Sequence, residues 1–103
     1  MGVEMSLDAI RRARSGLQVA SAKLDGVAHN TANLATKDFH ELSVEGVETK
    51  SGAKVQISTR SRSGTSPVEQ SVERRIAAVT YSANLAVLKA ADDMVGETID
   101  ILE

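Results

Sequence analysis

The chain has no cysteine, and this absence excludes several kinds of site at once. A disulfide bond, a thiolate metal centre and a cysteine nucleophile all need the missing thiol group. Aromatic residues are nearly absent too, with one phenylalanine, one tyrosine and no tryptophan in 103 residues. The apolar 42% of the chain therefore consists mainly of small and branched aliphatic residues, which favour close packing between helices over a bulky globular core.

The sequence also lacks a long apolar run and a strong net charge. No stretch approaches the roughly 18 apolar residues of a membrane span, so we expect no membrane insertion. The net charge of −2 gives no general attraction to nucleic acid. No basic stretch followed by an apolar segment opens the chain, so we expect any export to proceed without a cleavable signal peptide. The length indicates a single domain spanning 1–103.

Apolar residues recur three and four positions apart over residues 3–34 and predict one long helix there. Gly16 and Gly26 lie inside it, and each costs about 1 kcal/mol of helix stability relative to alanine. We therefore expect this helix to need a packing partner. The repeating positions form a coiled-coil-like seam: Ile10, Ala13, Leu17, Ala20, Leu24, Val27, Thr31 and Leu34.

The connecting segment, 35–66, has a different pattern. Leu42 and Val44, and later Val55 and Ile57, alternate with polar residues and predict two strands. Residues 48–52 are suited to the turn between them, and 58–66 form a polar loop. A lone hairpin is marginally stable in water, so we expect it to pack on the helices or to be mobile.

A second helix is predicted at 67–102, where Ser66, Pro67 and Glu69 form a helix-start signal. Two apolar seams overlap on it and make a face wider than one partner helix covers, so we expect self-association. The first seam is Val72, Ile76, Val79, Ala83, Ala86 and Ala90, and the second is Tyr81, Leu85, Leu88, Asp92, Val95, Ile99 and Leu102.

These elements predict a mainly α fold, in which two long antiparallel helices form a coiled-coil-like hairpin joined by a short middle segment with a β-hairpin. Charge favours the antiparallel pairing, because Arg11, Arg12 and Arg14 would lie beside an acidic helix end. The acidic residues of that helix end are Asp92, Asp93, Glu97, Asp100 and Glu103. Each such surface ion pair contributes only about 0–1 kcal/mol.

No part of the sequence has the spacing of a catalytic or metal site. His29 and His40 are separated by eleven positions, with no carboxylates at ligand spacing. The serines of 58–66 lack a nucleophile-elbow pattern, and the glycines form no phosphate loop. Arg60 and Arg62 could contact phosphate, but no aromatic residue lies between them. We therefore expect no enzyme activity, no metal, no cofactor and no nucleic-acid partner.

Two blocks of the chain resemble the terminal signatures of the bacterial flagellar axial family, which builds the rod and hook. Residues 24–40 (LDGVAHNTANLATKDFH) are similar to the family's N-terminal A-N-N-x-A-N-x-x-T-x-G-[FY] pattern. Residues 72–102 are similar to its C-terminal helix, with Y-x-A-N-x-x-V followed by an acidic residue and methionine. The matching positions are Ala28, Asn30, Ala32, Asn33, Thr36, Phe39, Tyr81, Ala83, Asn84, Val87, Asp93 and Met94.

The chain departs from this pattern at two places. His29 stands where the family has its first paired asparagine, and Lys37-Asp38 replaces a proline-glycine. The family's glycine would serve a turn with positive φ, which aspartate adopts less readily. The middle segment is short, as in the small proximal-rod subunits.

The resemblance implies a structural subunit of the flagellar basal-body rod that self-assembles through its terminal helices. It would reside in the periplasmic rod and serve motility. Its expected partners are other copies of itself, other axial subunits and the flagellar type III export apparatus, and we expect a homo-oligomer. The alternative is a coiled-coil adaptor or regulatory protein, related to axial subunits, that binds rod or export components without forming the rod.

We expect the assembly interface on the two helices and the loop after the first. Two interpretations of the asparagines remain open: they hydrogen-bond between subunits and fix register, or Asn30 and Asn33 only end the first helix. Phe39 either anchors the loop or is local core. The expected interface residues are Leu17, Leu24, Asn30, Asn33, Phe39, Tyr81, Asn84, Leu85, Leu88 and Met94.

Overall fold

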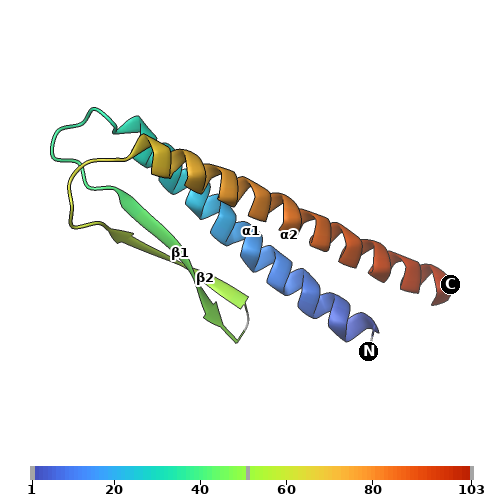
Figure 1. The fold of residues 1–103 in the computed structure, drawn as a ribbon. Helices are drawn as coiled ribbons and strands as arrows, with labels where there is room; N and C mark the ends of the chain where they lie inside the picture. Colours follow the sequence, from blue (N-terminus) through green and yellow to red (C-terminus); the bar gives the residue numbers. More distant parts are fainter. Residues whose placement is uncertain (1, 51, 103) are drawn as a thin grey trace.

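The computed structural model describes residues 2–50 and 52–102 and contains two long helices and one β-hairpin. Helix α1 covers Gly2–Ala32, strands β1 and β2 cover Leu42–Thr49 and Gly52–Thr59, and α2 covers Pro67–Leu102. Both termini lie at the same end, so the helices are antiparallel (Figure 1). The molecule measures 62 × 23 × 15 Å. The predicted mainly α fold with a hairpin in its middle is confirmed.

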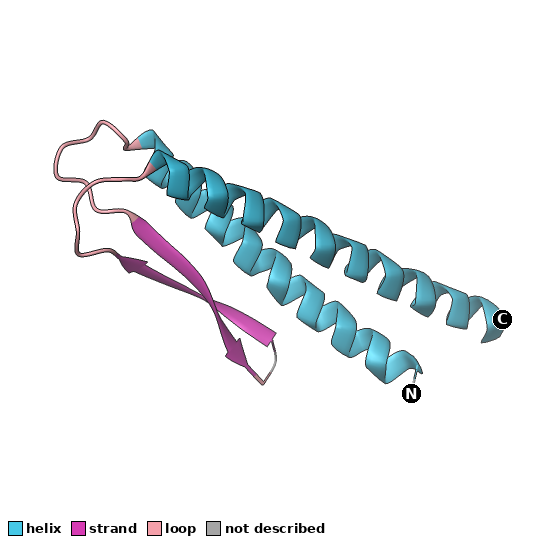
Figure 2. Cartoon of the chain, in the orientation of Figure 1, coloured by secondary structure: helices cyan, strands magenta, loops and turns pink. Residues whose placement is uncertain are grey.

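The hairpin packs on a different face of α1 from α2, so α1 is the central element (Figures 1 and 2). The strands are antiparallel, with Leu42 opposite Thr59 and Thr49 opposite Gly52. Ser15 on α1 accepts a hydrogen bond from the Ala53 amide, with 3.2 Å between Oγ and N. Within the described ranges, the backbone of α2 does not approach either strand. Among the residues described, α1 and the segments that flank the strands are what connect the hairpin to α2.

The interface between the helices consists of small and polar residues at seven-residue spacing. On α1, Ala13, Ala20 and Val27 are buried, as the predicted seam requires. Leu34, the last residue of that seam, is 44% exposed because α1 ends at Ala32, two residues earlier than predicted. The residues of α2 that face α1 are Gln70, Ala77, Asn84 and Ala91, all buried or half-buried.

Neither predicted seam on α2 coincides with the row of residues that faces α1. Leu88 of the second seam is half-buried, and the side chains of Val95, Ile99 and Leu102 lie outside the described residues. Val72, Ile76 and Val79 of the first seam are at least half exposed, and Tyr81 and Leu85 of the second are also classed as exposed. The smaller residues face α1 because they allow the two backbones to approach closely, whereas a row of bulky aliphatic side chains would separate them. The apolar periodicity of the sequence identified the apolar faces of α2, but it did not indicate which face α1 covers.

Gly16 and Gly26 are points of close approach on two different faces of α1. A Cβ at Gly16 would lie 2.5 Å from Oδ1 of Asn84 on α2. A Cβ at Gly26 would lie 2.8 Å from Cγ2 of Val44 on β1. Their cost to helix propensity is therefore offset by packing that a larger side chain would prevent.

The loop after α1 folds back onto the helix end. The Asn33 side chain donates to the His29 carbonyl at 2.8 Å and accepts from Thr36 Oγ1 at 3.0 Å, which closes the end of the helix. Asp38 has a φ of 57°, so it adopts the positive φ that the resemblance implied for this position. The half-buried Phe39 ring lies 5.5 Å from the His29 ring, centroid to centroid.

The predicted charge pairing between the helices was wrong for the side chains that the structure describes. Arg12 pairs with Asp8, one turn earlier in its own helix, at 3.0 Å. Neither Arg11 nor Arg14 forms an ion pair within the described part of the chain. Asp100 and Glu103, which belong to the same prediction, lie outside the described side chains. The antiparallel arrangement thus rests on packing and on the polar contacts described next.

Candidate assembly surface

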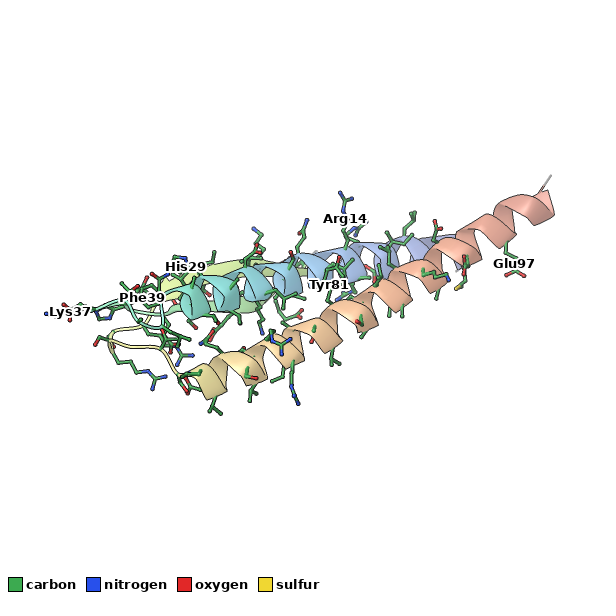
Figure 3. All side chains as sticks on the ribbon, turned by 90° about the horizontal axis from the view of Figure 1, so that it is seen from above. Arg14, His29, Lys37, Phe39, Tyr81 and Glu97 are labelled. Atoms are coloured by element: carbon green, nitrogen blue, oxygen red, sulfur yellow. The ribbon has the colours of Figure 1, made fainter. Side chains whose placement is uncertain are left out.

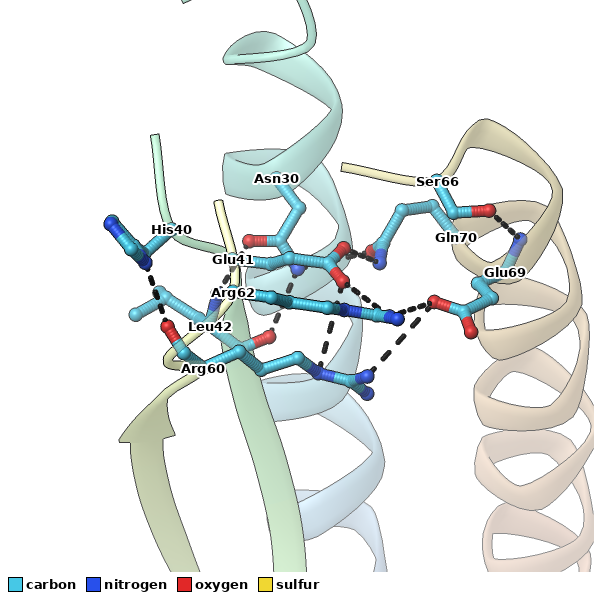
Figure 4. Close-up of polar contacts among 9 residues, drawn as sticks. All are labelled: Asn30, His40, Glu41, Leu42, Arg60, Arg62, Ser66, Glu69 and Gln70. Carbon is cyan, nitrogen blue, oxygen red and sulfur yellow. Dashed lines mark hydrogen bonds and ion pairs between the residues drawn. The ribbon is translucent and has the colours of Figure 1, made fainter. Parts of the chain in front are cut away.

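A cluster of polar side chains joins all four elements where the hairpin meets the helices (Figure 4). We call this cluster the polar junction. It combines the end of α1, the residue before β1, the residues after β2 and the first turn of α2. Its members are Asn30, Glu41, Arg60, Arg62, Glu69 and Gln70.

Asn30 is 2% exposed and binds the first residue of β1 as a neighbouring strand would. Its Oδ1 accepts from the Leu42 amide at 2.8 Å, and its Nδ2 donates to the Leu42 carbonyl at 3.0 Å. The same Nδ2 donates to Oε1 of Gln70 on α2 at 3.1 Å. One amide thus fixes the register between α1, β1 and α2, and both of its donor hydrogens are used inside the chain.

Glu41 is fully buried, and its carboxylate is held by three side chains. Gln70 Nε2 donates to Oε2 at 2.7 Å, and Arg62 Nη2 donates to Oε1 at 3.3 Å. Arg60 Nε lies 3.8 Å from Oε1 as an ion pair. A buried carboxylate is tolerated only with such hydrogen-bonded and charged partners. Because Glu41 precedes β1 and Arg60 follows β2, the carboxylate ties the base of the hairpin to α2.

The start of α2 completes the junction. Ser66 Oγ accepts from the Glu69 amide at 3.3 Å, which confirms the predicted helix-start signal. The Glu69 carboxylate accepts from Arg62 Nη2 at 2.8 Å. Sequence reasoning identified Asn30, but it considered Arg60 and Arg62 only for phosphate binding and missed Glu41 and Gln70 entirely. No spacing in the sequence indicates that residues 41 and 70 meet.

The outer face of α2 carries a continuous row of apolar side chains, which we call the α2 stripe. Its bulky members are 48–74% exposed, the most exposed being Val68. From Val68 to Ala90 the stripe is about 33 Å long at the helical rise per residue. Contiguous exposed apolar surface of this kind usually marks an interaction site. The stripe consists of Val68, Val72, Ile76, Val79, Ala83, Ala86, Val87 and Ala90.

The ten predicted interface residues fall into two groups, and none belongs to the α2 stripe. The first group serves contacts inside the chain: Leu17, Leu24, Asn30, Asn33, Phe39, Asn84 and Leu88 are buried or half-buried. The second group, Tyr81, Leu85 and Met94, is 39%, 49% and 52% exposed. Tyr81, labelled in Figure 3, lines one depression together with Leu17 of α1.

Other kinds of site find little support in the part of the chain that the structure describes. No group of three or more histidine, cysteine, aspartate or glutamate side chains there is arranged to hold a metal ion. Among the described helices, none is long and apolar enough to cross a membrane.

Comparison with protein-family models gives no match for this chain. Comparison with curated proteins gives no significant match either.

Proposed function

We propose that this chain is a self-assembling structural subunit of the bacterial flagellar rod, and that the α2 stripe is where neighbouring subunits meet. The observation that carries the proposal is the exposure of the stripe, with Val79 69% and Ile76 52% accessible on a helix whose opposite side is already packed. The two blocks that resemble axial proteins indicate that the assembly is the flagellar rod. A rod subunit would be exported by the flagellar type III apparatus and would reside in the periplasmic rod.

The hydrophobic effect supports assembly through this face. Burying one Val or Ile side chain contributes about 1.5–3 kcal/mol at full burial, and the stripe's bulky residues are 48–74% exposed in the free chain. The thin helix interface of alanines, Gly16 and Asn84 leaves these larger side chains available for a partner. Partner burial would then supply stability that the isolated chain lacks.

The test compares two aspartate substitutions that are two residues apart in α2 and lie on different sides of the helix. Ile76→Asp, in the stripe, should weaken self-association by about tenfold or more, because a carboxylate would be buried against apolar side chains. Ala78→Asp, exposed on another side of the same turn, is the matched control and should associate as the parent does. Sedimentation velocity measures both. If Ile76→Asp associated as strongly as the parent, the claim that subunits meet at the α2 stripe would be refuted.

The second candidate, an adaptor that binds rod or export components without forming the rod, is favoured by one observation. Asn30 and Asn33 use their amides inside the chain, so they do not supply the register-fixing bonds expected between rod subunits. The adaptor would form a small closed oligomer and would be missing from purified basal bodies. Recovery of the chain in basal bodies, with loss of motility when its gene is deleted, would exclude it.

A further inference from the structure

Three basic side chains converge on a groove between the first half of α1 and the tip of the hairpin. Arg11 and Arg14 come from adjacent turns of α1, and Lys54 comes from β2. The hydroxyl-bearing Ser15 and Thr49 line the same groove. Arg11, Arg14 and Lys54 are exposed, and none has an ion-pair partner among the described side chains.

The carboxylates near this groove leave its positive charge largely uncompensated. Asp8 is engaged by Arg12 at 3.0 Å. Glu48, opposite Ala53 in the hairpin register, is the nearest acidic residue by position on the strands and forms no ion pair within the described range. Three cations thus lie beside one unpaired carboxylate, on a chain whose net charge is −2. The compensating negative charge is elsewhere on the molecule.

That negative charge lies on the last turns of α2. Asp92, Asp93 and Glu97 are exposed and, like the groove cations, have no ion-pair partner in the described part of the chain. This end of α2 extends beyond the start of α1, and Glu97 points away from α1 while Arg14 points away from α2 (Figures 1 and 3). The two charged surfaces are therefore directed to different sides and do not meet within one chain.

We infer that the basic groove of one copy binds the acidic end of α2 of a second copy. The inference rests on the proposed self-assembly and specifies its direction. A groove and a helix end are different surfaces, so the contact is head-to-tail and leaves one free groove and one free end for further copies. Repetition of this contact gives an open polymer when successive copies do not close into a ring. The α2 stripe supplies most of the affinity, and the charges select the orientation.

A charge-swap experiment tests this pairing. Variant A carries Arg11→Glu and Arg14→Glu, and variant B carries Asp92→Lys and Asp93→Lys. All four positions are exposed, so both variants should keep the parent's far-ultraviolet circular dichroism. At low ionic strength, where surface charges are least screened, each variant alone should self-associate about tenfold more weakly than the parent. An equimolar mixture of A and B should recover the parent's association, because each groove then meets an end of opposite charge.

The outcomes separate this inference from the proposed function. A mixture that associates no better than A or B alone would overturn the pairing. Parent-like association of A and B, together with weakened association of Ile76→Asp, would overturn the pairing and leave self-assembly in place. Binding of the parent to phosphatidylglycerol vesicles that A loses, with self-association unchanged in A, would assign the groove to an anionic surface and also overturn the pairing. Dissociation of both the parent and the A–B mixture when the salt concentration is raised would support the pairing.

Discussion

The polar junction makes Asn30→Asp the most informative single substitution in the chain. The side chain keeps its shape, and the oxygen that accepts from the Leu42 amide can remain. The nitrogen becomes an oxygen, which would face the Leu42 carbonyl at 3.0 Å and Gln70 Oε1 at 3.1 Å. Two hydrogen bonds worth about 1 kcal/mol each are lost, and one buried and one part-buried acceptor are left without this donor. We expect a loss of about 2–4 kcal/mol in the free energy of unfolding at neutral pH.

The loss should shrink as the pH falls, and this separates the explanation from general damage. The new carboxyl would be buried against two oxygens, so its folded-state pKa should lie above the unfolded value of about 3.9. A group with a raised folded-state pKa makes the folded state bind more protons, so stability relative to the parent rises as the pH falls. Once protonated, the carboxyl can donate to one of the facing oxygens.

Urea denaturation followed by circular dichroism, below the concentration of self-association, measures the difference from the parent across about pH 4 to about pH 7. A variant with the parent's midpoint at neutral pH would refute the reasoning, because Asn30 would then not hold the junction. A loss that stays constant with pH would show that the facing oxygens are not its cause.

Three further substitutions probe the backbone and the close approaches. Gly16→Ala should destabilise the chain by about 1–2 kcal/mol despite the better helix propensity, because its Cβ would lie 2.5 Å from Asn84. Gly96→Ala should instead stabilise it by about 0.5–1 kcal/mol, because the added Cβ would meet no described atom within 4 Å beyond its chain neighbours and its own helix backbone. Thermal unfolding that ranks the two variants in the opposite order would place the helix contact elsewhere. Asp38→Gly should raise stability by up to about 1 kcal/mol, since glycine adopts a φ of 57° without steric cost. A lower unfolding midpoint for that variant would show that the aspartate side chain itself supports the loop.

Much of the fold followed from local signals in the sequence. The start of α2 was predictable because Ser66, Pro67 and Glu69 act within one turn, and the strands because Leu42, Val44, Val55 and Ile57 alternate with polar residues. The seam of α1 was predictable because Ala13, Ala20 and Val27 keep a regular spacing on one face. Each of these signals lies within a few residues of the structure it specifies.

The candidate site was harder to predict because it depends on contacts between distant segments. Glu41 and Gln70 carry no local pattern, and only the return of the chain after β2 brings them together. The face of α2 that meets α1 was missed for a different reason. Its residues are Gln70, Ala77, Asn84 and Ala91, whose low hydrophobicity hides the seven-residue repeat, while the more apolar stripe remains exposed. The unpartnered face was foreseen, and six of its eight residues belong to the first predicted seam, but the predicted interface residues included none of them.

The central claim is that the α2 stripe is covered by a neighbouring copy in the assembled state. Because the chain has no cysteine, Ile76→Cys introduces the single thiol in the protein, and its reaction rate with a maleimide reports the exposure of the stripe. We predict fast labelling of the dilute monomer and strong protection in the assembled state, with Ala78→Cys protected far less. Equal labelling of Ile76→Cys in the dilute and the assembled protein would contradict the account.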